Sequence, residues 1–457
     1  MFRLREAADA LRAAVRGPDA PVTGVTTDSR AVAPGDLFVA LEGERFDGHR
    51  FADAALAAGA AAVMVREPEA VATPGAPILV VPDTRAGLGQ LAAWWRGRFV
   101  LTVVGVTGSN GKTTVKELTA AILREHAGPE AVLATRGNLN NDIGLPLMLL
   151  SLRAGHRYAV LEMGMNHLGE IRYLTGLARP SVAVINNAGT AHIGELGSRE
   201  NIARAKGEIF EGLAEEGTRI LNADDAFLPY WSGLRGNTRV LLFGLDHAAD
   251  VTAGVEAVEG GSLLRLRTPA GEVAARLHLP GLHNVRNALA AAAVATTLGV
   301  PLSAIARGLD VCRGVQGRLQ ASPGPDGSVV VDDTYNANPD STRAAIDWLA
   351  RAEGRRILVL GDMGELGAGG EVLHAEVGAH ARESGLDGFY ALGDLARHSA
   401  TAFGPGARHY DDVEALLQEL RGVCAPHTTL LVKGSRFMRM ERVVRGLATG
   451  GVGAGEH

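Results

Sequence analysis

A short glycine-rich loop separates an apolar run, 101–106, from a helix-like segment. The loop consists of Thr107, Gly108, Ser109, Asn110, Gly111, Lys112 and Thr113. Glycines allow a tight turn in which successive N–H groups point inward, and the start of the helix adds the positive end of its dipole. The loop therefore predicts a triphosphate site, with Lys112 on the outer phosphates and the Thr113 hydroxyl on Mg²⁺. The strict P-loop pattern requires glycine at Val106, so the loop alone does not decide the function.

Length and composition indicate the number of domains and argue against nucleic-acid-binding and membrane-spanning proteins. A chain of 457 residues is too long for one core and predicts about three domains. The net charge of −6, with both signs intermixed, argues against nucleic acid as a partner. The longest apolar stretch, 54–65, is far shorter than the roughly 20 residues that span a bilayer, so no membrane span is expected. Two distant cysteines and the lack of a signal-peptide pattern at residues 1–6 predict a cytoplasmic location.

The first part of the chain, residues 1–99, predicts a small α/β domain. Short strand-like runs alternate there with helical patterns that begin at His49 and at Thr84. The strand-like runs are 36–41, 61–65 and 78–81.

Residues 100–316 predict a central parallel-sheet domain that carries the glycine loop. Near-continuous apolar runs of this kind form strands that are covered on both faces. Residues 250–279 instead alternate over short segments with glycine turns, which predicts a small antiparallel ribbon. A helix is expected over 283–298, and the glycines of 313–317 mark the next boundary. The apolar runs are 100–106, 158–161, 181–185, 219–222 and 240–243.

Residues 317–457 alternate again and predict a C-terminal Rossmann-like domain. The glycine-rich end, 450–455, has nothing to bury and is expected to be a frayed tail. The fold class expected for the whole chain is thus α/β with three domains. The strands expected in the last domain are 328–331, 357–360, 388–391 and 430–432.

Polar side chains follow several of the predicted strands. Because ligands bind at the carboxyl edge of open parallel sheets, these residues are candidates for a site. A strand must also end in something polar, so each residue taken singly is as consistent with an ordinary turn. The residues are Glu162, Asn186, Asn187, Asp332, Asp333, Asp362 and Lys433.

His192 and Lys206 are two further candidates. His192 follows a predicted strand, where a neutral imidazole could bind a metal or polarise a phosphate. Helical spacing places Lys206 on one face with Ile202, Ile209 and Leu213. A charged amine on an apolar face is costly unless it is paired or chemically altered. A solvated histidine and a lysine that extends to solvent remain the alternatives.

Taken together, these segments resemble the Mur ligases of peptidoglycan synthesis over nearly the whole chain. The resemblance explains why the loop departs from the strict P-loop pattern. Several segments are similar in particular to the branch of the family that adds D-alanyl-D-alanine. The similar segments are 107–113, 137–146, 161–167, 186–192, 332–339, 361–367 and 433–436.

The resemblance implies an ATP-dependent ligase that joins an acid to a D-amino acid. The expected reaction adds D-alanyl-D-alanine to UDP-N-acetylmuramoyl-tripeptide through an acyl phosphate and releases ADP and phosphate. It also implies a monomer. Another amino-acid-adding ligase of the Mur and folylpolyglutamate superfamily, or a non-catalytic nucleotide-binding homologue, remains an alternative.

The resemblance also implies roles for individual residues. Thr113 and Glu162 are expected to hold one Mg²⁺, and His192 with a carbamylated Lys206 a second one. The expected catalytic residues are Lys112, Glu162, His192, Lys206 and Arg318. The expected ATP-binding residues are Thr107, Gly108, Ser109, Asn110, Gly111, Lys112, Thr113, Thr114, Asn284, Asn287, Arg318 and Asp333. The expected substrate residues are Ser29, Arg30, Asp47 and His49 for the UDP sugar, and Asn336 and Asn338 for the dipeptide.

Arg318, Asp333 and Lys433 belong to a different predicted domain from the glycine loop. Catalysis is therefore expected to need closure of the third domain on the second, with an open arrangement when no ligand is bound.

Overall fold

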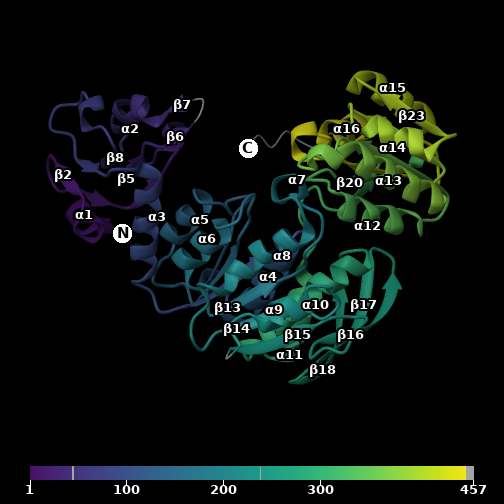
Figure 1. Ribbon diagram of the computed structural model, residues 1–457, viewed down its shortest axis with the longest axis horizontal. Helices are drawn as coiled ribbons and strands as arrows, with labels where there is room; N and C mark the ends of the chain where they lie inside the picture. Colours follow the sequence, from purple (N-terminus) through teal and green to yellow (C-terminus); the bar gives the residue numbers. More distant parts are fainter. Residues whose placement is uncertain (44–45, 237, 449–457) are drawn as a thin grey trace.

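The computed structural model describes residues 1–43, 46–236 and 238–448, and the predicted tail at 450–455 lies outside these residues. Figure 1 shows three α/β units in chain order, coloured purple, teal and green to yellow. The expected α/β class with three sheet-based units is confirmed.

The N-terminal unit is built on a five-stranded sheet in the order β2-β9-β8-β5-β4. Its central strands β5 and β8 are parallel and buried along their whole length, as their apolar sequences require. The strands are β1 (Phe2–Arg3), β2 (Ala14–Arg16), β3 (Pro21–Val22), β4 (Gly24–Thr26), β5 (Asp36–Val39), β6 (Glu42–Gly43), β7 (Phe46–Asp47), β8 (Ala62–Val65) and β9 (Ile78–Val80). The helices are α1 (Leu4–Leu11), α2 (Ala52–Ala57) and α3 (Thr84–Arg96).

The central unit is a six-stranded parallel sheet in the order β11-β12-β10-β13-β14-β15. After β10 the chain adds strands first on one side and then on the other, so β10 marks a switch point of the kind that binds ligands. The strands are β10 (Thr102–Thr107), β11 (Val132–Ala134), β12 (Tyr158–Glu162), β13 (Val182–Ile185), β14 (Thr218–Asn222) and β15 (Arg239–Phe243). The helices are α4 (Lys112–Ala127), α5 (Gly144–Leu150), α6 (Glu170–Ala178), α7 (Ile193–Leu196), α8 (Arg199–Gly207) and α9 (Leu228–Gly233).

The predicted antiparallel ribbon is present as a separate three-stranded sheet beside the central unit. It consists of β16 (Thr252–Val258), β17 (Gly261–Thr268) and β18 (Gly271–Leu277). Two helices follow, α10 (Leu282–Thr297) and α11 (Leu302–Val311), and both pack against α4.

The C-terminal unit is a six-stranded sheet in the order β19-β20-β24-β21-β22-β23, parallel except for β19. Separate apolar clusters cover its two faces. The strands are β19 (Gln320–Pro323), β20 (Val329–Asp333), β21 (Arg355–Gly361), β22 (Gly388–Leu392), β23 (Ala407–Tyr410) and β24 (Thr428–Lys433). The helices are α12 (Pro339–Leu349), α13 (Gly370–Glu383), α14 (Ala396–Phe403), α15 (Val413–Val423) and α16 (Glu441–Leu447).

The N-terminal and central units share one hydrophobic core. Helix α3 packs against α5 and α6, and a single cluster joins Leu88 and Trp95 of α3 to Leu145 and Leu174 of the central unit. The indole Nε1 of Trp95 also donates a hydrogen bond to the Leu152 carbonyl at 3.2 Å. The predicted boundary at residue 99 therefore lies beside a packed contact.

Several strands were not predicted, namely β1, β2, β3, β4, β6, β7, β11, β19 and β23. Each has two to four residues, which is too short for an alternating pattern to stand out from the adjoining turns. The predicted burial of Ile202, Lys206, Ile209 and Leu213 is confirmed, but α8 ends at Gly207, so Ile209 lies in a following 3-10 turn and Leu213 beyond it.

No helix among the described residues is both long enough and apolar enough to span a membrane.

We expect Trp95→Ala to lower the free energy of unfolding by about 3–5 kcal/mol, because the indole fills the core shared by two units. Guanidinium unfolding followed by circular dichroism measures the change. The matched control is Trp94→Ala, which removes a neighbouring half-buried indole and should cost about 1 kcal/mol. Equal losses in the two variants would contradict the shared core.

Candidate active site

The carboxyl edges of the central and C-terminal sheets line one cavity of about 860 Å³. Strand register explains part of this arrangement. Val106 lies opposite Glu162 across β10 and β12, and Asp333 lies opposite Lys433 across β20 and β24. Residues far apart in the sequence therefore reach the same cavity.

The glycine loop joins β10 to the first turn of α4. Gly111 has a φ of 79°, a left-handed conformation that favours glycine. A Cβ atom at this position would lie 2.2 Å from Asn287 Oδ1 and 2.5 Å from Asn186 Nδ2. Glycine is thus required here both by the backbone conformation and by the close approach of two side chains.

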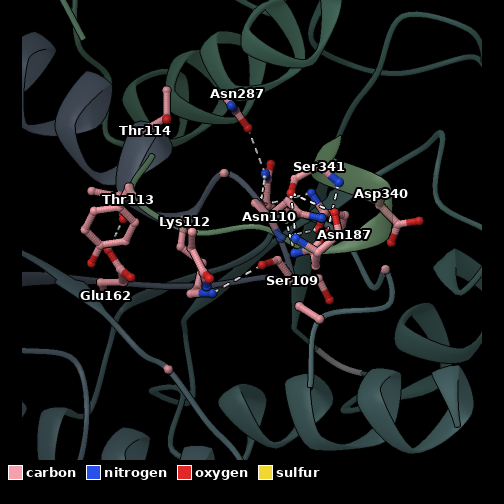
Figure 2. Close-up of a pocket in the computed structure, with 18 of the residues that line it drawn as sticks. Ser109, Asn110, Lys112, Thr113, Thr114, Glu162, Asn187, Asn287, Asp340 and Ser341 are labelled. Atoms are coloured by element: carbon pink, nitrogen blue, oxygen red, sulfur yellow. Dashed lines mark hydrogen bonds between the residues drawn. The ribbon is translucent and has the colours of Figure 1, made fainter. Parts of the chain in front are cut away.

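Asn187 and Asn186, which follow β13, hold the loop in shape. The Asn110 N–H donates to Asn187 Oδ1 at 2.9 Å, and the Ser109 N–H donates to the Asn187 carbonyl at 3.0 Å. The side-chain amides of Asn186 and Asn187 donate in turn to the Asn110 carbonyl. Figure 2 shows Asn187 against Ser109 and Asn110, with Lys112 and Thr113 on the other side of the loop.

The loop and its surroundings suit an anion. Lys112 Nζ reaches back to the Gly108 carbonyl at 2.8 Å, and burial lowers the pKa of this amine. Ser109 Oγ and Arg318 Nε are buried and have no hydrogen-bond partner among the described residues. Two cations and two unused polar atoms around a glycine loop fit the phosphates of a nucleotide.

Thr113 and Glu162 form the first predicted metal site. The Thr113 hydroxyl donates to Glu162 Oε2 at 2.9 Å, and the Asn140 amide donates to Oε1 at 2.8 Å. Arg318 of the C-terminal unit donates to the Thr113 hydroxyl at 3.1 Å and lies over the Tyr335 ring at 4.5 Å. The buried carboxylate and hydroxyl are hard oxygen donors, which fits the ligand preference of Mg²⁺.

Lys206 is buried, and its side-chain amine makes no hydrogen bond or ion pair with any described residue. Burial is the main reason that its pKa lies well below the ordinary value, and the charge of Lys112 lowers it further while Asp225 raises it. Both neighbours line the cavity, whereas Lys206 itself is not among the lining residues.

His192 lines the cavity in a left-handed conformation, with a φ of 65°. Its Nδ1 lies 2.7 Å from Glu365 Oε2, within hydrogen-bonding distance, although the two groups are not aligned for a regular hydrogen bond. This contact is the main reason that the pKa of Glu365 lies below its ordinary value.

Asn284 and Asn287 lie on the first turns of α10 and are linked to each other at 3.2 Å. The Asn186 amide donates to Asn287 Oδ1 at 2.8 Å, which connects this pair to the glycine loop. Asn284 also donates to the Pro280 carbonyl at 2.8 Å. The neighbouring His283 has its pKa lowered to about 4, chiefly by burial.

The predicted C-terminal residues differ in their environment. Asp333 is paired with Lys433 Nζ at 2.6 Å. Asn338 caps α12 through Ser341 and donates to Asn110 Oδ1 at 2.8 Å. Asn336 is exposed, and its side chain accepts a hydrogen bond from the Ala337 N–H.

The C-terminal sheet contacts the loop region. Besides the contacts of Arg318 and Asn338, Asp340 accepts hydrogen bonds from the Thr190 N–H and hydroxyl at 2.6 and 2.9 Å. Polar pairs thus join the second and third units in this structure, and the opening expected without ligand stays a prediction.

The predicted residues of the N-terminal unit do not line this cavity. Arg30 is exposed and paired with Asp28, which lowers the pKa of that carboxyl to about 2, and Ser29 lies beside it. His49 is buried, with Nδ1 2.7 Å from Asp47 Oδ1 and Nε2 accepting from the Arg66 N–H. Both ring nitrogens of His49 are therefore in use.

The cavity gathers the predicted residues Ser109, Lys112, Thr113, Glu162, His192, Arg318 and Asp333. The unpredicted residues include Asn140 and Asp225, which line the cavity, and Glu365, which contacts His192. Asn140 and Glu365 stand inside the segments that carried the family resemblance, which was the available signal. Asp225 had no such signal, since it follows β14 in an ordinary turn sequence.

A phosphate loop, two cations and a buried carboxylate between two α/β units fit the class of ATP-dependent enzymes whose site lies between domains. Comparisons with known proteins agree. The chain matches "Mur ligase family, catalytic domain" at 21–96, "Mur ligase middle domain" at 106–295 and "Mur ligase, glutamate ligase domain" at 317–436. The chain belongs to the Mur ligase family.

Full-length relatives are also similar. The UDP-N-acetylmuramoyl-tripeptide--D-alanyl-D-alanine ligase of Escherichia coli (strain K12) is 44% identical, and the match covers 98% of each chain. The crystal structure of MurF from Acinetobacter baumannii matches with a TM-score of 0.90 at 38% identity, over 97% of each chain. MurF of Thermotoga maritima in complex with ADP matches with a TM-score of 0.83 at 32% identity, over 93% of this chain and 97% of the other.

We expect Gly111→Ala to weaken ATP binding by about tenfold or more, because the new methyl group collides with Asn287 and Asn186. Calorimetric titration with a non-hydrolysable ATP analogue measures the affinity. Gly128→Ala is the matched control: Gly128 also has a positive φ and lies at the other end of α4, but a Cβ atom there would meet nothing within 4 Å. Similar affinities for both variants would show that the close approach at Gly111 is unimportant.

Proposed function

We propose that this chain catalyses the ATP-dependent addition of D-alanyl-D-alanine to UDP-N-acetylmuramoyl-tripeptide, which yields the UDP-linked pentapeptide of peptidoglycan synthesis. The observation that carries the proposal is the meeting of two domains at the glycine loop, where Arg318 lies 3.1 Å from the Thr113 hydroxyl. The full-length similarity to D-alanyl-D-alanine ligases of this family supports the choice of substrates.

The reaction follows in two steps. The tripeptide carboxylate attacks the γ-phosphorus of ATP, so that ADP leaves and an acyl phosphate forms. The amine of D-alanyl-D-alanine then attacks the acyl carbon, loses a proton and expels phosphate. Both steps concentrate negative charge, which Lys112, Arg318 and the N–H groups of the loop are placed to stabilise.

Thr113 and Glu162 would hold a Mg²⁺ ion, which would neutralise the negative charge of the outer phosphates. The oxygen donors of this pair support the assignment, because Glu162 is buried and the Asn140 amide fixes its orientation. Asn140 is thus assigned a positioning role.

His192 and Lys206 would hold a second Mg²⁺, with Lys206 carbamylated by CO₂. The lowered pKa of Lys206 supports this, since the neutral amine is the form that adds CO₂. Its lack of any partner among the described residues supports it as well, because a carbamate would supply oxygen atoms where the structure offers a lone buried nitrogen.

The remaining assignments place Asn284 and Asn287 beside adenine and Asp333 beside ribose. Ser29, Arg30, Asp47 and His49 serve the UDP sugar, His49 by holding Asp47 in position. Asn336 and Asn338 serve the dipeptide. The domains are 1–99, 100–316 and 317–457, and the enzyme acts as a cytoplasmic monomer.

We expect phosphate release from ATP to require Mg²⁺, the UDP-linked tripeptide and D-alanyl-D-alanine together. A coupled phosphate assay with each component omitted in turn measures this, and mass spectrometry identifies the UDP-linked pentapeptide. Release with glutamate or a single diamino acid in place of the dipeptide would assign a different ligase of the superfamily. Lack of release with every pair of substrates would favour a non-catalytic nucleotide-binding protein.

We expect activity to depend on dissolved CO₂ at mildly acidic pH. The folded pKa of Lys206 is lowered, so the amine becomes neutral at a lower pH than an ordinary lysine and can form a carbamate near neutrality. Acid reverses carbamate formation, so activity should fall in CO₂-free buffer as the pH drops below neutrality and should return on adding bicarbonate. Lys206→Met should be inactive and insensitive to bicarbonate. A bicarbonate response in that variant would contradict the assignment.

A further inference from the structure

His192 and Glu365 meet across the boundary between the central and C-terminal units. His192 follows β13, Glu365 follows β21, and Nδ1 lies 2.7 Å from Oε2. The His192 side chain is mostly buried, with 18% exposed, whereas half of the Glu365 side chain is exposed. The reaction proposed above gives Glu365 no role.

The backbone around the pair is built for close contact. The Gly194 N–H donates to the Glu365 carbonyl at 2.9 Å. A Cβ atom on Gly194 would lie only 2.4 Å from the Gly367 nitrogen, so the two loops touch through glycine. Ile193 packs against the C-terminal apolar cluster. We call this contact, formed by His192 to Gly194 with Glu365 and Gly367, the clasp.

Glu365 itself has a φ of 62°, an uncommon conformation for a residue with a side chain. Such conformations persist where surrounding contacts hold them, and they gather at sites where geometry matters. The clasp is therefore more than a chance pairing of two flexible surface charges, which would need neither the glycines nor the strained backbone.

The chemistry of metal-binding histidine suggests what the clasp does. An imidazole that binds a cation through one nitrogen usually presents the N–H of the other to a carboxylate, which fixes its tautomer and its direction. Glu365 Oε2, an acceptor 2.7 Å from Nδ1, favours the proton at that atom. The lone pair of Nε2 is then free for a divalent cation.

We propose that Glu365 is a positioning residue that prepares His192 for a divalent cation only while the C-terminal unit contacts the central unit. The inference rests on the proposed function, because it takes His192 as a metal ligand. Contact between the units then raises the cation affinity of His192, and by thermodynamic linkage the bound cation favours that contact by the same factor. Metal occupancy and the approach of Arg318 to Thr113 thus rise together.

The test measures equilibrium binding of Mn²⁺ to the full chain, using the electron paramagnetic resonance signal of the free ion. His192→Ala identifies the site in question as the one that this variant loses. Glu365→Ala should weaken that site by about 10–100-fold, the usual effect of removing a carboxylate behind a metal-binding histidine. Glu365→Gln keeps an oxygen that accepts the Nδ1 proton and should restore most of the affinity.

Glu371→Ala is the matched control, since Glu371 is an exposed carboxylate on α13 of the same unit and lies outside the clasp. It should bind Mn²⁺ like the unaltered chain. Circular dichroism checks that each variant is folded.

A double-mutant cycle tests the coupling to domain contact. Asp340→Ala removes the hydrogen bonds to Thr190 without touching His192 or Glu365. Alone, this substitution should weaken Mn²⁺ binding at the His192 site. Combined with Glu365→Ala it should weaken binding no further, because the clasp that transmits the contact is already lost.

Four results would overturn the inference. Glu365→Ala that binds Mn²⁺ as tightly as the unaltered chain would reduce the pair to an ordinary ion pair. If Glu365→Gln does not restore binding, the loss of Mn²⁺ affinity comes from the missing charge of Glu365 and not from the missing oxygen that accepts the proton. Additive or absent effects of Asp340→Ala would remove the coupling. An unaltered chain without any His192-dependent Mn²⁺ site would overturn the proposed second metal site and the inference with it.

Discussion

The hydrogen bonds from Asn186 and Asn187 to the glycine loop are the interaction on which the site depends. Strand β13 lies next to β10 in the sheet. The two asparagines at the end of β13 are therefore close enough to bind the glycine loop that follows β10. The Ser109 and Asn110 N–H groups are used in shaping the loop, so the N–H groups at the start of α4 are the ones left for an anion. The parallel pairing of β10 and β13 thus places the asparagines where they can shape a phosphate site.

Burial and unused polar groups give this site its chemical character. Lys112 and Lys206 are two amines whose pKa values are lowered chiefly by burial, yet they differ in their partners. Lys112 is held by loop carbonyls, whereas Lys206 has no partner among the described residues. The contacts of Lys112 suit a fixed cation beside phosphate. The buried nitrogen of Lys206 is compensated only by a chemical change or by a ligand.

The sequence predicted the strands that are long, apolar and buried, such as β10 and β12, together with the loop residues between β10 and α4. It also predicted that Lys206 points inward, because helical spacing fixes the direction of a side chain. It did not predict the Glu365 contact with His192 or the Asp340 contact with Thr190. Contacts between domains depend on how rigid units meet, and no periodicity along the chain records that.

The two contacts between neighbouring units differ in kind, and helix α3 forms one of them. Its buried face belongs to one core with the central unit, whereas polar pairs and a glycine contact contribute to the join with the C-terminal unit. Apolar burial on the scale of a core makes neighbouring units melt together, while hydrogen-bonded joins of this kind open at lower free energy. Calorimetrically, the chain should thus behave as two cooperative blocks, although its sheets divide it into three.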